Sequence, residues 1–249
     1  MTPLQQLRAG RTVRRLIQLF VGLWLYGVAM AMLIRSTLGL DPWDVFHDGV
    51  RSLTGLSFGT VVILAGVAVL LLWIPLKQWP GLGTVANTIV IGLATDATLA
   101  VLEAPVGLGW RTLFLIGGIV LNGLAGALYI GSQYSPGPRD GLMTGLSRRT
   151  GLSLRLVRTA LEVTVLVIGW LLGGVVGLGT VLYAIGIGPV IQFFLPMVTV
   201  DLRGSTVDAQ GEGEHLRGAG LPQSAGGDGE GPTGVGDVVD EEYRAVHSG

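Results

Sequence analysis

The stretch GLGTV at residues 81–85 recurs as GLGTV at residues 177–181, a shift of 96 positions. The same shift, without a gap, aligns further stretches: TGLS at 54–57 with TGLS at 150–153, PWD at 42–44 with PRD at 138–140, and Arg15, Gly22, Gly27 and Ser36 with Arg111, Gly118, Gly123 and Ser132. A dozen or more identities in one ungapped register indicate a duplicated unit. In a membrane protein, such a duplication constrains architecture and function together.

The composition indicates a membrane protein. Apolar residues make up 49% of the 249 residues, charged residues make up 13%, and there are 41 glycines. Several apolar stretches reach or approach the roughly 20 residues that an α-helix needs to cross about 30 Å of hydrocarbon. We therefore expect an all-α, polytopic membrane protein whose main partner is the lipid bilayer. The chain has no cysteine, which excludes disulfides, thiolate nucleophiles and cysteine-ligated metal sites.

Six spans are predicted, three in each copy. They cover residues 16–34, 58–76, 82–102, 113–130, 156–172 and 178–198. Because three is odd, a first copy that enters from the cytoplasm ends outside, and the second copy must begin outside. The copies are then inverted repeats, related by a pseudo-twofold axis in the membrane plane. We expect repeat 1 at residues 14–104 and repeat 2 at residues 110–200.

Positive charges favour a cytoplasmic N-terminus. This orientation places eleven basic residues on or near the cytoplasmic face: Arg8, Arg11, Arg14, Arg15, Lys77, Arg139, Arg148, Arg149, Arg155, Arg158 and Arg203. Three lie outside: Arg35, Arg51 and Arg111. Cytoplasmic loops of membrane proteins carry the excess of Lys and Arg. We therefore expect a cytoplasmic N-terminal segment at residues 1–13 and a cytoplasmic C-terminus.

The C-terminal region differs from the rest in charge. Residues 201–249 hold 3 Arg/Lys against 10 Asp/Glu, whereas residues 1–200 hold 13 against 7. The region is also rich in Gly, Ser and Pro and lacks a long apolar run. Such a composition cannot bury enough apolar surface to fold. Residues 201–249 are predicted to form a disordered, acidic cytoplasmic tail.

A segment too short to cross the membrane lies between the first two spans of each copy, at residues 42–53 and 138–149. Each begins with proline, which suits a first helical position, and carries an aspartate two residues later, which suits the positive end of the helix dipole. A Thr-Gly pair then supplies the glycine at which a helix ends. Twelve residues at about 1.5 Å each cover about 18 Å, as expected of a re-entrant half-helix or an interfacial helix.

These segments admit two interpretations. In the first, the half-helices point their N-termini toward a central site, as broken helices do in many inverted-repeat transporters. In the second, Asp44 and Asp140 only cap short surface helices. Recurrence in the same register does not separate the two, because a duplication copies a structural cap as faithfully as a binding residue.

Several longer motifs can be compared with known families. They are GPRDGLM at 137–143, RTG at 149–151, Arg158, Glu162, GWLLGG at 169–174, LGLDPWD at 38–44 and both GLGT stretches. Together they resemble the YczE/YitT-like family of bacterial integral membrane proteins, over roughly residues 12–200 and without the tail. The resemblance implies a multi-span protein of the bacterial plasma membrane. It implies no particular reaction or substrate.

Charged residues inside the predicted spans break the symmetry of the repeat. Arg158 and Glu162 lie four residues apart on one helix face and can pair, while Val62 and Gly66 occupy the aligned positions of the first copy. Asp96, in the third span, is not repeated either. Intramembrane charges are costly and mark functional sites by default. A duplicated scaffold can acquire a particular site where its two copies differ.

We predict a substrate-binding site on this basis. Its members are Arg139, Asp140, Arg158 and Glu162, with Asp96 and Asp44 as secondary members. Alternatively, Arg158 and Glu162 neutralise each other and stabilise the packing of their span, and Asp96 lies close enough to the outer interface to reach water.

The sequence offers little for catalysis. His47, the only histidine outside the tail, lies beside Asp44 and Asp48 and is either a proton-linked group or an interfacial polar residue. Metal-protease spacing, a Ser/His/Asp arrangement and a phosphate loop are absent from the sequence. We expect no enzymatic activity, cofactor or metal. No basic, aromatic-interleaved surface indicates nucleic acid, and the pattern carries no signal for an oligomeric state.

Two functional classes remain. The first is a secondary transporter or exporter of a small solute, with anions among the candidates, moved by rocking of the inverted halves. The second is a non-transporting scaffold or regulator of another membrane process. A polar cavity at the interface of the repeats would favour transport, whereas a tightly packed apolar interface would favour a scaffold.

Overall fold

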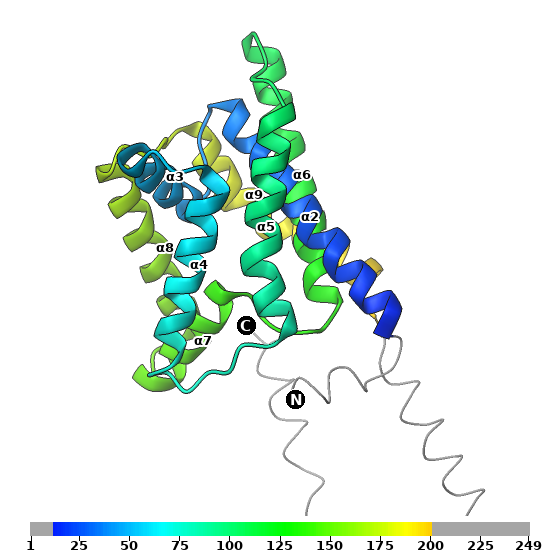
Figure 1. The fold of residues 1–249 in the computed structure, drawn as a ribbon, viewed down its shortest axis with the longest axis vertical. Coiled ribbons are helices and arrows are strands. Elements are labelled where there is room, and N and C mark those ends of the chain that lie inside the picture. Colours follow the sequence, from blue (N-terminus) through cyan, green and yellow to red (C-terminus); the bar gives the residue numbers. More distant parts are fainter. Residues whose placement is uncertain (1–11, 201–249) are drawn as a thin grey trace, which may run out of the picture. The chain divides into compact units, whose positions relative to one another are not determined.

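The computed structural model describes residues 12–200, which form eight α-helices and no strand (Figure 1). The helices are α2 (Thr12–Ser36), α3 (Pro42–Thr54), α4 (Phe58–Trp73), α5 (Leu82–Val101), α6 (Leu108–Gly131), α7 (Pro138–Thr150), α8 (Leu154–Leu171) and α9 (Leu178–Val198). The predicted all-α class is confirmed for this part of the chain. The predictions for the acidic tail, and for most of the N-terminal segment, fall on residues outside it.

The order of helices repeats with the 96-residue shift. Helices α2, α3, α4 and α5 each begin 96 residues before α6, α7, α8 and α9, respectively. Local caps explain the shared boundaries. Ser57 and Ser153 each accept a hydrogen bond at the start of α4 and α8, and Gly55 and Gly151 end α3 and α7 with a φ of 71°. Both short helices are thus confirmed, with one residue more than predicted at their C-termini.

Four helices are long and apolar enough to cross a membrane: α2, α5, α6 and α9. A fifth candidate is the pair α3 and α4, whose axes bend by 113° at a short break. Two predicted spans are weaker than expected. Helix α4 has only 16 residues because the chain turns after Trp73, ahead of Pro75, and α8 carries three charged residues within its 18.

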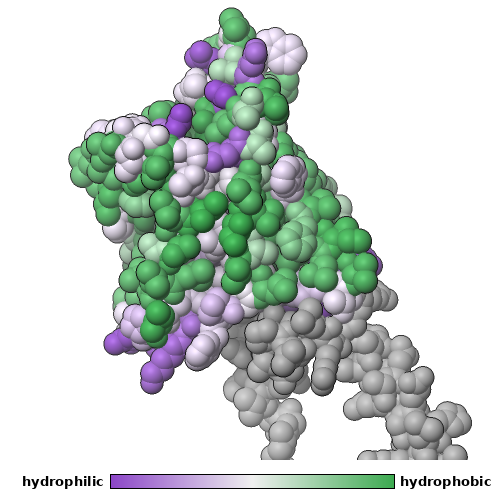
Figure 2. Space-filling model, viewed as in Figure 1, coloured by the Kyte–Doolittle hydropathy of each residue, from purple (hydrophilic) through white to green (hydrophobic). Residues whose placement is uncertain are grey.

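The outer surface carries the side chains expected against lipid. Large apolar side chains are exposed on several helices, including Phe20 and Trp24 of α2 and Ile185 and Phe193 of α9. Hydrophobic side chains cover the middle of the face drawn in Figure 2, while hydrophilic ones gather toward its two ends. Water would penalise so much exposed apolar area, so this distribution indicates a bilayer around the helices.

Packing differs between the two copies. The packing of α2 on α5 in the first copy recurs as the packing of α6 on α9 in the second, and α2 also packs on α6 across the two copies. Helix α4 packs closely on α5 where Gly59 and Gly92 meet, since a methyl group on either would collide with the backbone of the other. The equivalent helices α8 and α9 lack this contact: a methyl group at Gly188 would meet nothing within 4 Å.

Candidate functional site

A cavity of about 260 Å³ lies between the two copies. Many of its lining residues are aligned partners in the 96-residue register: Pro42 and Pro138, Trp43 and Arg139, Val62 and Arg158, Gly66 and Glu162, Thr88 and Ala184, and Ile91 and Ile187. Both short helices and both sets of longer helices therefore contribute to one site. The first residues of α3 and α7, Pro42 and Pro138, form part of its wall.

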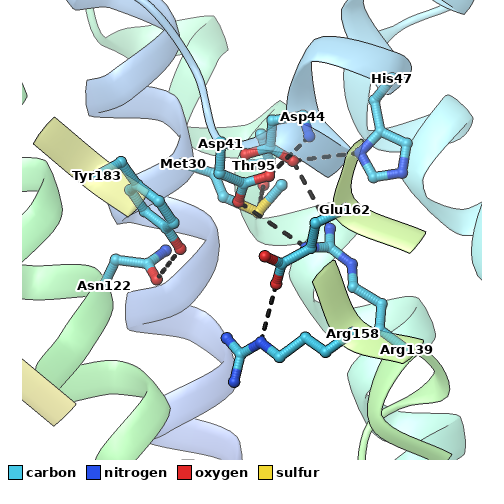
Figure 3. Close-up of polar contacts among 10 residues, drawn as sticks. All are labelled: Met30, Asp41, Asp44, His47, Thr95, Asn122, Arg139, Arg158, Glu162 and Tyr183. Atoms are coloured by element: carbon cyan, nitrogen blue, oxygen red, sulfur yellow. Dashed lines mark hydrogen bonds and ion pairs between the residues drawn. The ribbon is translucent and has the colours of Figure 1, made fainter. Parts of the chain in front are cut away.

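Arg139 of α7 connects the second copy to the first (Figure 3). Its guanidinium nitrogens lie 3.8 Å from Asp41 Oδ2 and 3.7 Å from Asp44 Oδ1. The same guanidinium lies over the ring of Trp43, 5.0 Å from its centroid. A cation over an indole face and beside two carboxylates is held from three sides. This arrangement fixes the start of α7 against the start of α3.

Asp41 has two roles at the start of α3. It is the N-cap residue, with its Oδ1 accepting a hydrogen bond of 2.8 Å from the backbone N–H of Asp44. Its other oxygen faces Arg139. Asp41 lies on the connection before α3, outside the candidate spans, and burial raises the pKa of its carboxyl to about 6. The neighbouring Asp44 adds to this rise, and Arg139 opposes it.

Asp44 and His47 are buried beneath this contact. His47 Nδ1 lies 3.1 Å from Asp44 Oδ1, and the two side chains are 2% and 0% exposed. Asp44 Oδ2 has no hydrogen-bond partner among the described residues. The sequence predicts Asp44 to be either a cap or a member of the site; in the structure Asp41 caps α3, and Asp44 is buried and paired with His47. His47 lines the cavity with its ring packed edge-on to Phe58.

The other predicted members lie across the cavity. Arg158 Nε donates to Glu162 Oε1 at 2.9 Å, which confirms that the two residues pair. Both side chains line the cavity and stay accessible, at 61% and 34% exposed. Asp140 also lines the cavity and is exposed, and it forms no salt bridge within residues 12–200. The structure thus brings Arg139, Asp140, Arg158 and Glu162 to one space.

Asp96 is placed elsewhere. It is not among the described residues that line the cavity. Its carboxylate accepts hydrogen bonds from Ser57 Oγ, at 2.5 Å, and from the backbone N–H of Gly59, at 2.7 Å. A carboxylate at these positions satisfies the free N–H groups at the start of α4. The geometry of Asp96 is that of a cap that joins α5 to α4.

Two tyrosines that sequence reasoning did not select lie in the cavity wall. Tyr183 donates a hydrogen bond of 3.0 Å to Asn122 Oδ1, and Tyr26 lies near Tyr183. The 96-residue register contains a signal for them. It aligns Tyr26 with Asn122 and Asn87 with Tyr183, so each copy supplies one tyrosine and one asparagine in exchanged positions. All four residues line the cavity.

The site also contains polar atoms without partners. Trp43 Nε1 and Asn122 Nδ2 are buried donors with no hydrogen bond in the described part of the chain, and both residues line the cavity. Buried polar atoms are rarely left unpaired, because each costs about 1–3 kcal/mol. Together with the accessible charges, these donors make the cavity able to bind a small polar molecule by hydrogen bonds and ion pairs.

Known proteins similar to this chain are themselves membrane proteins or uncharacterised. An "Uncharacterized protein" of Haemophilus influenzae (strain ATCC 51907 / DSM 11121 / KW20 / Rd) is 44% identical over 180 residues, which are 72% of this chain and 83% of the relative. "Uncharacterized membrane protein YczE" of Bacillus subtilis (strain 168) is 31% identical over 179 residues, 71% of this chain and 83% of the relative. "Uncharacterized protein YyaS" of the same organism is 28% identical over 185 residues, 72% and 90%.

No solved structure matched the chain significantly. The similarity to YczE confirms the resemblance recognised in the motifs, and it agrees with the apolar helices in placing the chain in a membrane. A family model described as "Family of unknown function (DUF6198)" matches residues 13–196, which is most of the chain. The protein is therefore a membrane protein and belongs to the YczE-like DUF6198 family.

Proposed function

We propose that the protein is a secondary transporter or exporter of a small solute, that it works by alternating access between two inverted repeats, and that it is not an enzyme. The observation that carries this proposal is the cavity lined by aligned residues of both copies, with charged and hydrogen-bonding groups in its wall. Transporters with internal repeats hold their substrate where the repeats meet, near broken helices. A scaffold would need no polar space there, and a packed apolar interface would have favoured that alternative.

The proposed architecture has six spans, with α3–α4 and α7–α8 each acting as a broken unit. Helices α3 and α7 lie toward opposite ends of the helix bundle in Figure 1, which supports an inverted relation between the copies. Their prolines both reach the cavity wall, which supports half-helices that enter from opposite faces. The excess of basic residues on one side supports cytoplasmic N- and C-termini in a bacterial plasma membrane.

The packing difference between the copies supports a two-state mechanism. Helix α4 is closed on α5 in the first copy, whereas α8 stands away from α9 in the second. If the copies exchange these arrangements, α8 closes on α9 while α4 opens from α5. Because the copies are inverted, this exchange moves the opening of the cavity from one face of the membrane to the other. The cavity itself stays at the centre of both states.

Access from both faces can be tested without knowing the solute. The chain has no cysteine, so Ala184→Cys places a single thiol in the cavity wall. Val181→Cys places one on a neighbouring turn of α9, at a side chain that is 55% exposed and does not line the cavity. The reagent is MTSET, a charged methanethiosulfonate that does not cross bilayers. We expect Ala184→Cys to react in intact cells and in inside-out vesicles, and Val181→Cys in neither. Reaction from only one face, or from neither, contradicts alternating access.

The second state can be trapped by a cross-link. Ile63 contacts Gly92 in the closed first copy, and the aligned residues in the open copy are Thr159 and Gly188. We expect the Thr159→Cys/Gly188→Cys pair to form a disulfide under mild oxidation, measured as loss of free thiols by mass spectrometry.

A matched positive control comes from the closed copy. Gly66 and Thr88 are already in contact, so Gly66→Cys/Thr88→Cys should cross-link readily. Single-cysteine variants control for disulfides between molecules. If the Thr159/Gly188 pair stays reduced while the control pair is oxidised, the proposed closure of α8 on α9 does not occur.

A further inference from the structure

The charges around the cavity do not balance. Among the described residues, four carboxylates lie in or directly behind its wall, and two guanidinium groups face them. The carboxylates belong to Asp41, Asp44, Asp140 and Glu162, and the guanidinium groups belong to Arg139 and Arg158. With all six groups ionised, the site carries two negative charges in excess. Its field therefore attracts cations and repels anions.

Both arginines are already engaged. Arg139 faces two carboxylates and a tryptophan ring, and Arg158 donates to Glu162. An anion at Arg139 would compete with the two carboxylates that already face it. An anion at the remaining N–H groups of Arg158 would lie beside the negative charge of Glu162. The sequence left anions among the candidate solutes. The ion pairs place a carboxylate beside each guanidinium before any ligand enters.

Asp140 is the carboxylate that remains available. It lines the cavity, it is exposed, and it forms no salt bridge within the described residues. Its carboxylate is in close contact with the backbone of Gly137, at the start of its own helix. Across the cavity, Glu162 is 34% exposed, so part of its carboxylate is accessible beside Arg158. A second feature independent of the acidic groups points to a ligand: Asn122, which is 1% exposed, leaves its Nδ2 unpaired in the cavity wall.

The remaining wall suits an organic ion rather than a bare metal ion. Tyr26, Tyr129 and Tyr183 line the cavity together with aliphatic residues such as Val69 and Ile191. Aromatic faces attract ammonium groups, and aliphatic side chains accommodate the carbon skeleton that an organic cation carries. The unpaired amide of Asn122 and indole N–H of Trp43 can donate to a carbonyl or hydroxyl on the same molecule.

We propose that the cavity binds a small organic cation, with its ammonium group between Asp140 and Glu162 and its carbon skeleton against the tyrosines. This inference rests on the proposed function and names the substrate class of the same site. Asp41 and Asp44 contribute negative potential from behind the wall. Asn122 and Trp43 favour solutes that also carry a hydrogen-bond acceptor.

The test measures how solutes protect a cavity thiol. In full-length Ala184→Cys protein in nanodiscs, the uncharged reagent N-ethylmaleimide modifies the thiol, and each solute is titrated for slowing of that reaction. The probes are butylammonium, butyrate and butyramide, which share a four-carbon skeleton and carry charges of +1, −1 and 0. We expect butylammonium to protect at the lowest concentration and butyrate to protect least.

Variants in the same background locate the ammonium group. Asp140→Asn should raise the half-protecting concentration of butylammonium about tenfold, because it removes the unpaired charge. Glu162→Gln should weaken butylammonium and strengthen butyrate, since it leaves Arg158 without its partner. The matched control is Glu103→Gln, which removes an exposed carboxylate outside the cavity and should change nothing. An unchanged reaction rate without solute shows that each variant keeps its fold around the thiol.

Each outcome bears on a separate claim. Protection by butyrate equal to or stronger than that by butylammonium overturns the organic-cation proposal, as does an Asp140→Asn variant with wild-type protection. Neither result touches transport, which is judged by MTSET access from both faces. Conversely, access from one face with selective protection by butylammonium refutes transport and leaves a cation-binding membrane protein.

Discussion

The two broken units, α3–α4 and α7–α8, have the same backbone arrangement, but α3 buries charged and polar side chains whereas α7 buries apolar residues and glycines. Both short helices begin at proline and end at glycine with the same φ of 71°. In α3 the polar residues Asp44 and His47 are fully enclosed, whereas in α7 the aligned aspartate, Asp140, faces the cavity. The first copy buries Asp44 behind the cavity wall, whereas the second copy holds Asp140 at the cavity surface.

The helices that pack against α3 and α7 explain this difference. Gly169 of α8 lets the backbone of α3 approach directly, because any Cβ there would collide with Val45 and Phe46. The aligned residue of α4 is Trp73, whose indole lies against Gly141 and donates to Pro138 O at 3.0 Å. Helix α3 is thus enclosed by close contact, while α7 is propped by a large side chain. Duplication preserved the caps, and exchanges of large for small residues made the two sites unlike.

The largest effect is expected from removing the indole of Trp73, which packs against α7 and has no counterpart at α3. Trp73 is 2% exposed, so Trp73→Ala should cost about 3–5 kcal/mol of unfolding free energy, because it leaves a void beside Gly141 and removes the hydrogen bond to Pro138 O. Trp170→Ala is the matched control, since that indole is 64% exposed. Reversible denaturant unfolding in mixed micelles measures both. Equal stability of the two variants would show that α7 does not depend on Trp73.

A smaller effect is expected at the break before α4. Asp96 of α5 caps α4, whereas the aligned residue of α9, Gln192, forms no such hydrogen bond with the start of α8 in the described part of the chain. Asp96→Ala should cost about 1.5–3 kcal/mol, because it removes charge-assisted hydrogen bonds. Protection of the cavity thiol by butylammonium should remain at the wild-type level. Loss of protection in a protein that stays folded would return Asp96 to the binding site.

Two substitutions at Asp41, the cap of α3, separate its structural role from the effect of its charge on binding. Asp41→Ala removes the side-chain cap and should cost about 1 kcal/mol, whereas Asp41→Asn keeps a good capping group. We expect Asp41→Asn to melt near the wild-type temperature and yet to bind butylammonium more weakly. Helix α7 has no side-chain cap at Gly137, so it offers no equivalent effect. Identical binding by Asp41→Asn and wild type would exclude Asp41 from the field of the site.

The smallest expected effect is a dependence on pH. Burial raises the pKa of Asp41 to about 6, next to Asp44, Arg139 and His47. Above pH 6 this carboxylate is charged and attracts a cation, and the attraction is lost as the pH falls through 6. Protection by butylammonium should therefore weaken severalfold between pH 7 and pH 5, and less so in Asp41→Asn. Stronger protection at the lower pH would contradict this assignment.

Much of the fold could be predicted because it depends on local signals. The prolines at 42 and 138 and the glycines at 55 and 151 set the ends of α3 and α7 at or within one residue of the predicted positions. The i, i+4 spacing was sufficient to predict the Arg158–Glu162 pair. Asp96 shows the limit: its position deep in a predicted span suggested a binding role, but its partners Ser57 and Gly59 lie almost 40 residues earlier in the sequence.

The sequence by itself determined the membrane class, the duplicated register and the short helices, because apolar length, caps and spacing act over a few residues. Only the tertiary structure decided which charges meet. Arg139 lies beside Asp41 and Asp44, which are more than 90 residues away in the sequence, and this contact pairs its positive charge with two carboxylates. The tertiary structure also decided that α4 closes on α5 while α8 stands free of α9. Such choices depend on the fit of distant surfaces, which no local pattern encodes.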